Sequence, residues 1–475
     1  MKYVYRTSYF YYFCSGFSNI NMLQQKSLAL LLGIMMTSAT CLAQSTNIRT
    51  THVVKQGETL YNIAKTYNVS VDDILSVNPT LSPDKYFIGM YINIPNSPAL
   101  QAIQNDINGV EEHTTAVPNR VQAAVILPFL SESINASERS KMVEYYRGFL
   151  MSVDSLKHQG VSVDIYTYDS GDKSNQSIDN ILKDPMLASM NLIIGPMYSS
   201  QIAPLAEYAQ NHKIRLIVPF TSKCMEVYNN PYVYMVNPPQ LYLNNVIFEH
   251  FVENFSDSQI VFYETNEQSK KEVEFVAGLK NYLDMKGIKY YNINKNSDNS
   301  AIVSQTNICK KNVIIPNSSS INALTLLTSK LKDFCQENPS YKVTLFGYPE
   351  WQTYHGTHLD NLYNFDTFIW SKFYSNVFES RTKDFMHDYY KWFNSELIAS
   401  YPKFGMLGFD TGYYFLSSIS KFSNEFEQNC NTMQFNPYQS GFKYIRMNNH
   451  GGYINTGVWF VHYSKDERRP IKIEY

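Results

Sequence analysis

The fold of the first module is decided by the stretch His52-Val53-Val54-Lys55-Gln56-Gly57-Glu58-Thr59-Leu60. It begins as a short alternating strand and continues as a turn, after which Thr59 can cap the helix that follows. That helix carries apolar residues at helical spacing, namely Leu60, Ile63, Ala64 and Tyr67. We therefore expect a strand that leads through a tight turn into an amphipathic helix.

The sequence that follows predicts the rest of a small module. Ser70 is placed to cap a second helix, and Asn78-Pro79 ends that helix because proline cannot continue it. A final strand runs over 88–95, with Ile92 and Ile94 on one face. The order strand–helix–helix–strand over residues 51–96 is near the lower size limit for a domain that folds alone.

These motifs closely resemble the LysM domain. The opening His52-x-Val54-x-x-Gly57-Glu58-Thr59-Leu60, the central Asn78-Pro79 and the closing Gly89-x-x-Ile92-x-Ile94-Pro95 all match it. The resemblance implies binding of N-acetylglucosamine polymers, chiefly peptidoglycan, in a shallow groove between two loops. It implies a set of glycan-binding residues: Gly57, Glu58, Thr59, Leu60, Asn78, Pro79 and Ile88. The alternative is that Leu60 is core and that Gly57 and Asn78-Pro79 only make turns.

Residues 1–43 have the features of an N-terminal extension and a signal peptide. Lys26 precedes the apolar run 28–36, and Cys41-Leu42-Ala43 offers a small-residue cleavage site before Gln44. Met22 would start a signal peptide of ordinary length. An uncleaved anchor and a lipid at Cys41 remain open, but the apolar run is shorter than a membrane span and the residues before Cys41 make a poor lipid-attachment signal. We expect an exported protein of the periplasm or cell envelope.

Composition narrows the functional classes. The 475 residues carry 40 basic and 42 acidic side chains, a net charge of −2, without a basic run, which disfavours a nucleic-acid partner. After Gln44 the chain keeps Cys224, Cys309, Cys335 and Cys430, whose spacing predicts no zinc site and leaves free thiols or disulfides open.

A polar linker over 97–119 leads into a large α/β region. Buried runs such as 121–129, 192–194 and 214–218 alternate with helical patterns such as 145–156. This alternation predicts parallel sheets, which place ligands outside the carboxyl ends of their strands.

Residues 120–475 resemble the type I periplasmic-binding-protein fold. The two α/β runs, the helix that begins near Gly408-Phe409-Asp410 and a hairpin turn at 448–452 carry the resemblance. It implies two lobes, with lobe one at about 120–238 and 365–425 and lobe two at about 239–364 and 426–475. The family includes receptors that close on a solute and relatives that regulate penicillin-binding proteins. The predicted fold class is therefore α/β: a βααβ LysM module plus a two-lobed domain with parallel sheets.

Strand ends supply the candidate cleft residues. By resemblance to amino-acid-binding members, the hydroxyls of Ser199, Ser200, Thr221 and Ser222 would hold a carboxylate. Helix capping explains these serines equally well. Glu350 and Trp351 could add an acid and a ring, but the Gln268-Ser269 region lacks the expected Tyr-Gly, which puts amino-acid capture in doubt.

The sequence shows no catalytic motif, and we predict a non-catalytic protein without a cofactor. The His355/His358 pair has no further ligand at family spacing, so no metal is expected. Our leading interpretation is an envelope protein that binds peptidoglycan and senses or regulates an envelope protein partner. The alternatives are a binding protein that delivers an amino-acid-like solute to a transporter, and an accessory or enzyme of cell-wall turnover.

Overall fold

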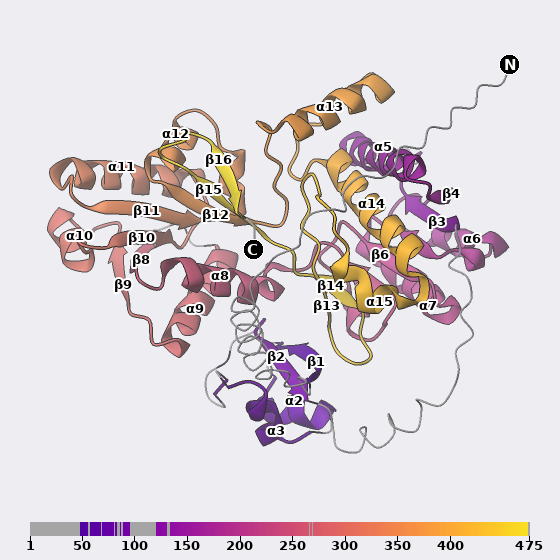
Figure 1. The fold of residues 1–475 in the computed structure, drawn as a ribbon, viewed down its shortest axis with the longest axis horizontal. Coiled ribbons are helices and arrows are strands. Elements are labelled where there is room, and N and C mark those ends of the chain that lie inside the picture. Colours follow the sequence, from indigo (N-terminus) through magenta and orange to yellow (C-terminus); the bar gives the residue numbers. More distant parts are fainter. Residues whose placement is uncertain are drawn as a thin grey trace, which may run out of the picture. The chain divides into compact units, whose positions relative to one another are not determined.

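The computed structural model describes residues 48–55, 58–67, 69–79, 81–82, 86, 89–95, 120–130, 134–265, 267 and 269–473 (Figure 1). The predicted signal peptide at 1–43 and the predicted linker at 97–119 lie outside the described residues. No helix in the described ranges combines the length and the apolar character that crossing a membrane requires.

The small module has the predicted order of elements. Strand β1 (Ile48–Val53) pairs antiparallel with β2 (Tyr91–Pro95), and helices α2 (Leu60–Tyr67) and α3 (Val71–Ser76) lie between them in sequence. Ser70 caps α3 in a capping box with Asp73, as the sequence predicts for an N-cap serine. Both helices and β2 contribute buried apolar residues, among them Leu60, Ile63, Ala64, Tyr67, Ile74, Ile92 and Ile94.

Lobe one is built on a seven-stranded sheet in the order β13-β14-β7-β6-β5-β3-β4. All neighbouring strands are parallel except β13 and β14, which form the predicted antiparallel hairpin. The strands are β3 (Arg120–Leu127), β4 (Ser162–Asp169), β5 (Leu192–Ile194), β6 (Arg215–Val218), β7 (Val233–Met235), β13 (Tyr444–Arg446) and β14 (Tyr453–Asn455).

Alternation along β3 shows how this sheet is covered on both faces. Val121, Ala123 and Val125 pack with α5 (Ala136–His158) and α14 (Phe404–Phe422), which lie side by side in Figure 1. Ala124 and Ile126 pack with α6 (Gln176–Ile181) and α7 (Ile202–His212) on the other face. A strand buried on both faces reads as a continuous apolar run, which is why the sequence shows one at this position.

Lobe two is built on a second seven-stranded sheet in the order β16-β15-β12-β11-β10-β8-β9. Its central strands are parallel, and β15 and β16 add an antiparallel edge. The strands are β8 (Gln259–Glu264), β9 (Tyr290–Asn294), β10 (Lys311–Pro316), β11 (Lys342–Gly347), β12 (Thr367–Ser371), β15 (Trp459–Tyr463) and β16 (Pro470–Ile473). The helices are α8 (Asn244–Phe255), α9 (Lys270–Met285), α10 (Asn299–Gln305), α11 (Ile321–Glu337) and α12 (Thr357–Asn364).

The two sheets confirm the predicted fold class, but the crossovers between lobes differ from the expected ones. Strand β12 pairs with β11 and β15 in lobe two, although we expected residues from 365 onward in lobe one. Strands β13 and β14 join lobe one through β7, although we expected residues from 426 onward in lobe two. Lobe-one elements therefore include 426–455, because the pairing of short strands with a sheet is set by tertiary contacts rather than by local pattern.

The segment between the lobes also carries helix α13 (Ser380–Phe393). Helix α14 begins at Phe404, four residues before Gly408, near which we expected it to begin. Two glycine contacts explain the close packing of α14 on α5: a Cβ at Gly408 of α14 would lie 1.9 Å from the Tyr145 carbonyl oxygen, and one at Gly148 of α5 would lie 1.7 Å from that of Gly405. Only glycine permits backbones to approach so closely.

Candidate functional site

Glu58, a predicted glycan-binding residue, lies at the centre of a hydrogen-bond network in the small module. Its Oε2 is 2.8 Å from His52 Nε2 and accepts a 2.8 Å hydrogen bond from the Lys55 backbone N–H. The other ring nitrogen of His52 lies 3.0 Å from the Tyr67 hydroxyl. The carboxylate thus holds the turn between β1 and α2 in place.

The electrostatics of Glu58 agree with this role. Burial raises the pKa of its carboxyl, but the His52 ring and the Lys55 N–H outweigh burial, so that the pKa of Glu58 is lowered from its usual value. Hydrogen bonds to the ionised form cause such a lowering.

The side chain of Asn78 makes three hydrogen bonds within the small module. Its Nδ2 donates to the carbonyl oxygens of Ile74 and Asn93, both at 2.7 Å, and its Oδ1 accepts from the Asn93 N–H at 2.8 Å. The side chain is buried and joins the end of α3 to β2. Asn78 therefore fixes the second loop and has no polar atom left for a sugar.

The remaining predicted glycan residues divide into three groups. Leu60 is buried in the core, whereas Thr59 and Pro79 are exposed. Gly57 and Ile88 lie outside the described residues. The hydroxyl of Tyr86, on the second loop, donates to the Glu58 carbonyl oxygen at 3.3 Å, so the structure ties together the two loops that the sequence singled out. Tyr61, 69% exposed beside Thr59, is an aromatic that the sequence analysis did not select.

The large domain contains a cavity of about 660 Å³ lined by residues of both lobes and of the segments that connect them. Its polar lining includes Ser222 from lobe one, Lys271 and Glu350 from lobe two, and Asn237 and Lys372 from the connections. This volume is in the range of small-molecule sites. We refer to it as the cleft cavity.

Lys372 follows β12 and brings a cation to the cleft cavity. Its Nζ donates to Asn237 Oδ1 and to the Pro238 carbonyl oxygen, both of which are neutral. Burial, together with the nearby charge of Lys271, lowers the pKa of Lys372 to about 8. At pH 7 the side chain therefore remains protonated and can attract an anionic group.

Glu350 brings the opposite charge. Its Oε1 accepts a 3.0 Å hydrogen bond from Lys271 Nζ, and both side chains are partly exposed. Lys271 lies in the first turn of α9, whose N-terminus adds partial positive charge. The cleft cavity thus presents both signs of charge within one lining.

The predicted cleft residues are only partly brought together. Ser222 and Glu350 line the cleft cavity. Thr221 Oγ1 instead accepts from the Lys223 N–H at 3.0 Å, and Ser200 Oγ donates to the Lys173 carbonyl oxygen at 2.9 Å. Ser199 opens a short 3₁₀ turn before α7.

Trp351, the last predicted cleft residue, is fully buried in lobe two. Its Nε1 donates to the Ser319 carbonyl oxygen at 3.1 Å, and its ring packs over Gly347. The side chain serves the core of the lobe, so its place beside Glu350 in sequence does not put it in the cavity.

Lys270, Lys271 and Lys372 are cleft residues that sequence reasoning missed. A signal for Lys372 was present, because it directly follows a buried strand, where parallel sheets place their ligands. Lys270 and Lys271 follow the N-cap Ser269 and so lie at a helix start.

Other candidate chemistry is sparse. Within the described part of the chain, no group of three or more His, Cys, Asp and Glu side chains is placed to hold a metal ion. Cys224, Cys309, Cys335 and Cys430 are free thiols, two of them buried.

Comparisons with known proteins give different matches for the small module and for the large domain. The LysM domain family matches residues 52–95. An endolysin of Bacillus phage B103 is 40% identical over 65 residues, which is 14% of this chain and 25% of that protein. The match thus spans a quarter of the endolysin's length.

Solved structures are similar to a larger part of the chain. One is an ABC transporter substrate-binding protein from Desulfitobacterium hafniense in complex with Leu. Its whole length matches 74% of this chain, at 14% identity and a TM-score of 0.40. Another is a putative branched-chain amino acid ABC transporter from Rhodospirillum rubrum. The match includes 96% of its length and 74% of this chain, at 11% identity and a TM-score of 0.46. The chain therefore carries a LysM domain at residues 52–95, followed by a two-lobed α/β domain.

Proposed function

We propose that this protein is a non-catalytic component of the bacterial cell envelope that binds peptidoglycan through its LysM domain. The match over residues 52–95, together with the two joined loops of that domain, carries the proposal. The signal-peptide pattern before Gln44 supports export to the periplasm or cell envelope. The two-lobed domain would then sense a ligand or regulate an envelope protein partner from a fixed place on the wall.

Sedimentation with purified peptidoglycan tests the anchor. The chain from Gln44 should sediment with the wall polymer, and an excess of a soluble N-acetylglucosamine tetramer should release it. A chain lacking residues 48–95 should stay in solution. Lys65→Ala, an exposed change in the last turn of α2, serves as the matched control and should sediment normally. Equal sedimentation with and without residues 48–95 would contradict the proposal.

The same incubation tests the non-catalytic assignment. We expect no soluble wall fragments to be released over hours at pH 7. Release that survives removal of residues 48–95 would instead favour an enzyme of wall turnover.

A second candidate function is favoured by the cleft cavity: capture of a small amino-acid-like solute for a transporter. Lys372 and Glu350 offer a cation and an anion in one lining, which suits a ligand that carries both charges. Calorimetric titration with the common amino acids tests this function. Saturable binding that Lys372→Met weakens about tenfold or more, the size of one charged hydrogen bond, would favour solute capture over the regulatory role.

A further inference from the structure

A second cavity of about 520 Å³ lies in the large domain, beside the cleft cavity. It is lined by residues between 352 and 363, which lead into and form α12, by 374–378 after β12, by 399–403 before α14, and by Tyr463 and Pro470 of β15 and β16. Tyr401 lines both cavities, so the two are neighbours across one side chain. We refer to this second one as the tyrosine cavity.

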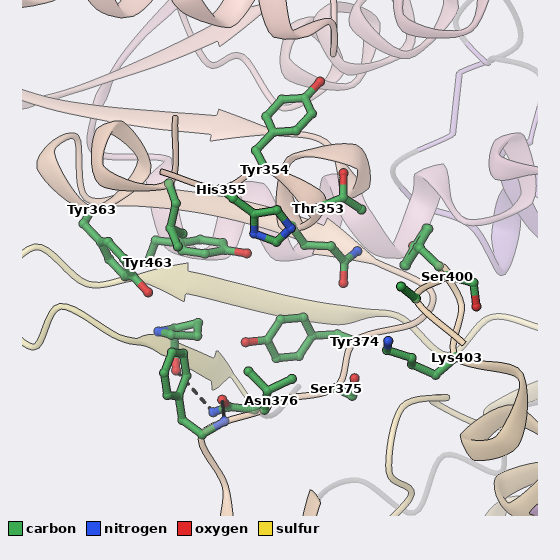
Figure 2. A pocket seen from close by; sticks show the side chains of 17 residues that line it. Thr353, Tyr354, His355, Tyr363, Tyr374, Ser375, Asn376, Ser400, Lys403 and Tyr463 are labelled. Carbon is green, nitrogen blue, oxygen red and sulfur yellow. Dashed lines mark hydrogen bonds between the residues drawn. The ribbon is translucent and has the colours of Figure 1, made fainter. Parts of the chain in front are cut away.

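Three tyrosines from separate elements meet in the tyrosine cavity. Figure 2 shows the phenol rings of Tyr363, Tyr374 and Tyr463 turned toward a common space. The ring centroids of Tyr363 and Tyr463 are 5.7 Å apart. The pKa of Tyr374 is raised by burial and then by its two tyrosine neighbours, as expected for hydroxyls that lie close together.

These hydroxyls are available to a ligand. The three residues are more than nine-tenths buried, yet their oxygens have no hydrogen-bond partner in the described part of the chain and are not sealed in the protein interior. A buried tyrosine normally finds a partner for its hydroxyl. Three such hydroxyls at one cavity supply donors and acceptors for a ligand's own hydroxyl or amide groups.

The lining offers no negative charge to a cationic ligand. No carboxylate is among the lining residues, and Lys403 is the cation of the set. Lys403 Nζ already donates to the Ile398 carbonyl oxygen at 3.2 Å, so it is not a free anion-binding group. A neutral ligand suits this lining better than an ion of either sign.

Apolar surface completes the lining. Leu359 and Pro470 stand among the tyrosine rings, and Val377 and Phe378 lie at the cavity with roughly half of their side chains exposed. A sugar ring presents apolar C–H faces and polar edges, which such walls and hydroxyls can match together. The acetamido group of an amino sugar adds both a methyl and an amide.

We propose that the tyrosine cavity binds a neutral acetamido sugar, the same unit of the wall glycan that the LysM domain binds. The identity of the sugar rests on the proposed function, whereas the neutral and partly apolar class rests on the cavity itself. The protein would then contact the glycan through two sites in separate domains.

Hydrogen–deuterium exchange of the full chain from Gln44 tests the proposal, with the N-acetylglucosamine dimer as the probe. We expect slower exchange in peptides that cover 353–363 and 374–378 when the dimer is added at saturating concentration. Peptides from the LysM domain report the anchor in the same experiment, so the two sites are read independently.

Paired variants make the test specific. Tyr374→Phe with Tyr463→Phe keeps both rings and removes two hydroxyls, and we expect the dimer to bind at least about tenfold more weakly at this cavity. Tyr390→Phe, an exposed tyrosine on α13 outside the lining, should leave binding unchanged.

Protection confined to the LysM peptides would overturn the second site and leave the proposed function intact. Protection confined to the tyrosine cavity would support the second site and contradict the LysM anchor. Protection of 353–378 by benzoate or leucine but not by the sugar dimer would overturn the neutral-sugar class. Binding that is unchanged in the double tyrosine variant would overturn the role of the hydroxyls.

Discussion

The LysM domain and the cleft cavity use their polar residues in opposite ways. In the LysM domain, Glu58 and Asn78 belong to the most recognisable motifs, and their polar atoms are engaged within the fold. In the cleft cavity, Lys372 and Glu350 belong to no motif, and they line the cavity although each also has a hydrogen-bond partner in the large domain. A motif that identifies a domain can therefore consist of residues that shape the binding loops rather than residues that touch the ligand.

The largest expected effect follows from removing the clamp in the LysM domain. Asn78→Ala deletes three hydrogen bonds: both backbone groups of Asn93 lose their Asn78 partner, and the Ile74 carbonyl keeps only the 3.3 Å bond from the Val77 N–H. We expect the free energy of unfolding of this domain to fall by about 4 kcal/mol, a large share of what so small a module holds. Hydrogen exchange of the LysM amides in rising denaturant measures it.

Ser76→Ala is the control for that change, because its exposed hydroxyl makes one local hydrogen bond to the Asp73 carbonyl. It should alter stability by less than about 0.5 kcal/mol. If Asn78→Ala were as mild as the control but abolished peptidoglycan binding, Asn78 would be a contact residue and the contrast drawn above would fail.

The second largest effect is expected at Asp410 in the large domain, whose side chain, like that of Asn78, is held by several hydrogen bonds within the fold. Its buried carboxylate accepts from the backbone N–H groups of Tyr438, Gln439 and Ser440 at 2.7 to 2.9 Å. Burial outweighs these bonds and raises the pKa of Asp410 to about 6. Because the folded-state pKa lies above the unfolded value of 3.8, its contribution is largest below pH 3.8 and is lost as the pH rises through 6.

We expect this loss to reach up to about 3 kcal/mol between pH 3.8 and pH 7. Asp410→Asn has no proton to lose and should remove this part of the pH dependence. Melting temperatures of both proteins between pH 4 and pH 8 measure the difference, with exposed Asp388→Asn as the control. Parallel melting curves for the wild type and Asp410→Asn across that range would refute the prediction.

The sequence predicted the elements that have their own periodicity. The strands Leu192–Ile194 and Arg215–Val218 fall where we expected them. The strands β9 and β16 were missed because edge strands with partly exposed residues carry little pattern, and the buried strand β7 was missed because three residues are too few to show one. The predicted positions of the crossovers between the lobes were wrong because local sequence does not encode which sheet β12 or β14 joins.

A smaller effect is expected at Glu58. Its lowered pKa means that the ionised carboxylate stabilises the fold above pH 4.5 and that this contribution is lost as the pH falls through the folded-state pKa. Glu58→Gln should cost about 1 kcal/mol at pH 7, since the group is partly exposed and solvent screens its interaction with His52. The difference from wild type should vanish at acid pH.

Denaturant unfolding of the LysM domain at pH 7 and below pH 4 checks this expectation, and Asp72→Asn, an exposed acid in the first turn of α3, is the control. Binding to peptidoglycan should persist in Glu58→Gln under conditions where the domain is folded. A folded variant that no longer binds would make Glu58 a sugar contact.

The candidate site was less predictable than the fold. Ser222 and Glu350 reach the cleft cavity, but Ser200 and Thr221 close local turns and Trp351 joins the core. Each of these side chains has a hydrogen-bond partner that lies close in sequence or inside its own lobe, and such partners are invisible to a search for chemistry at strand ends. Lys372 was missed because its importance depends on β12 belonging to lobe two.

The smallest effect on stability is expected at Lys372 of the cleft cavity, which contrasts most strongly with Asn78 of the LysM domain. Lys372→Met removes the hydrogen bonds to Asn237 and Pro238, which by itself destabilises the protein. It also removes a charge whose pKa is lowered because burial disfavours the protonated form, which by itself stabilises the protein below pH 8. Since these two effects oppose each other, we expect the free energy of unfolding to change by less than about 1 kcal/mol at pH 7, in contrast to Asn78→Ala.

Calorimetric melting of the full chain measures this change, with exposed Lys270→Met as the control. A loss above about 2 kcal/mol would mean that Lys372 holds the connection between the lobes together, and that its main role, like that of Asn78, is structural.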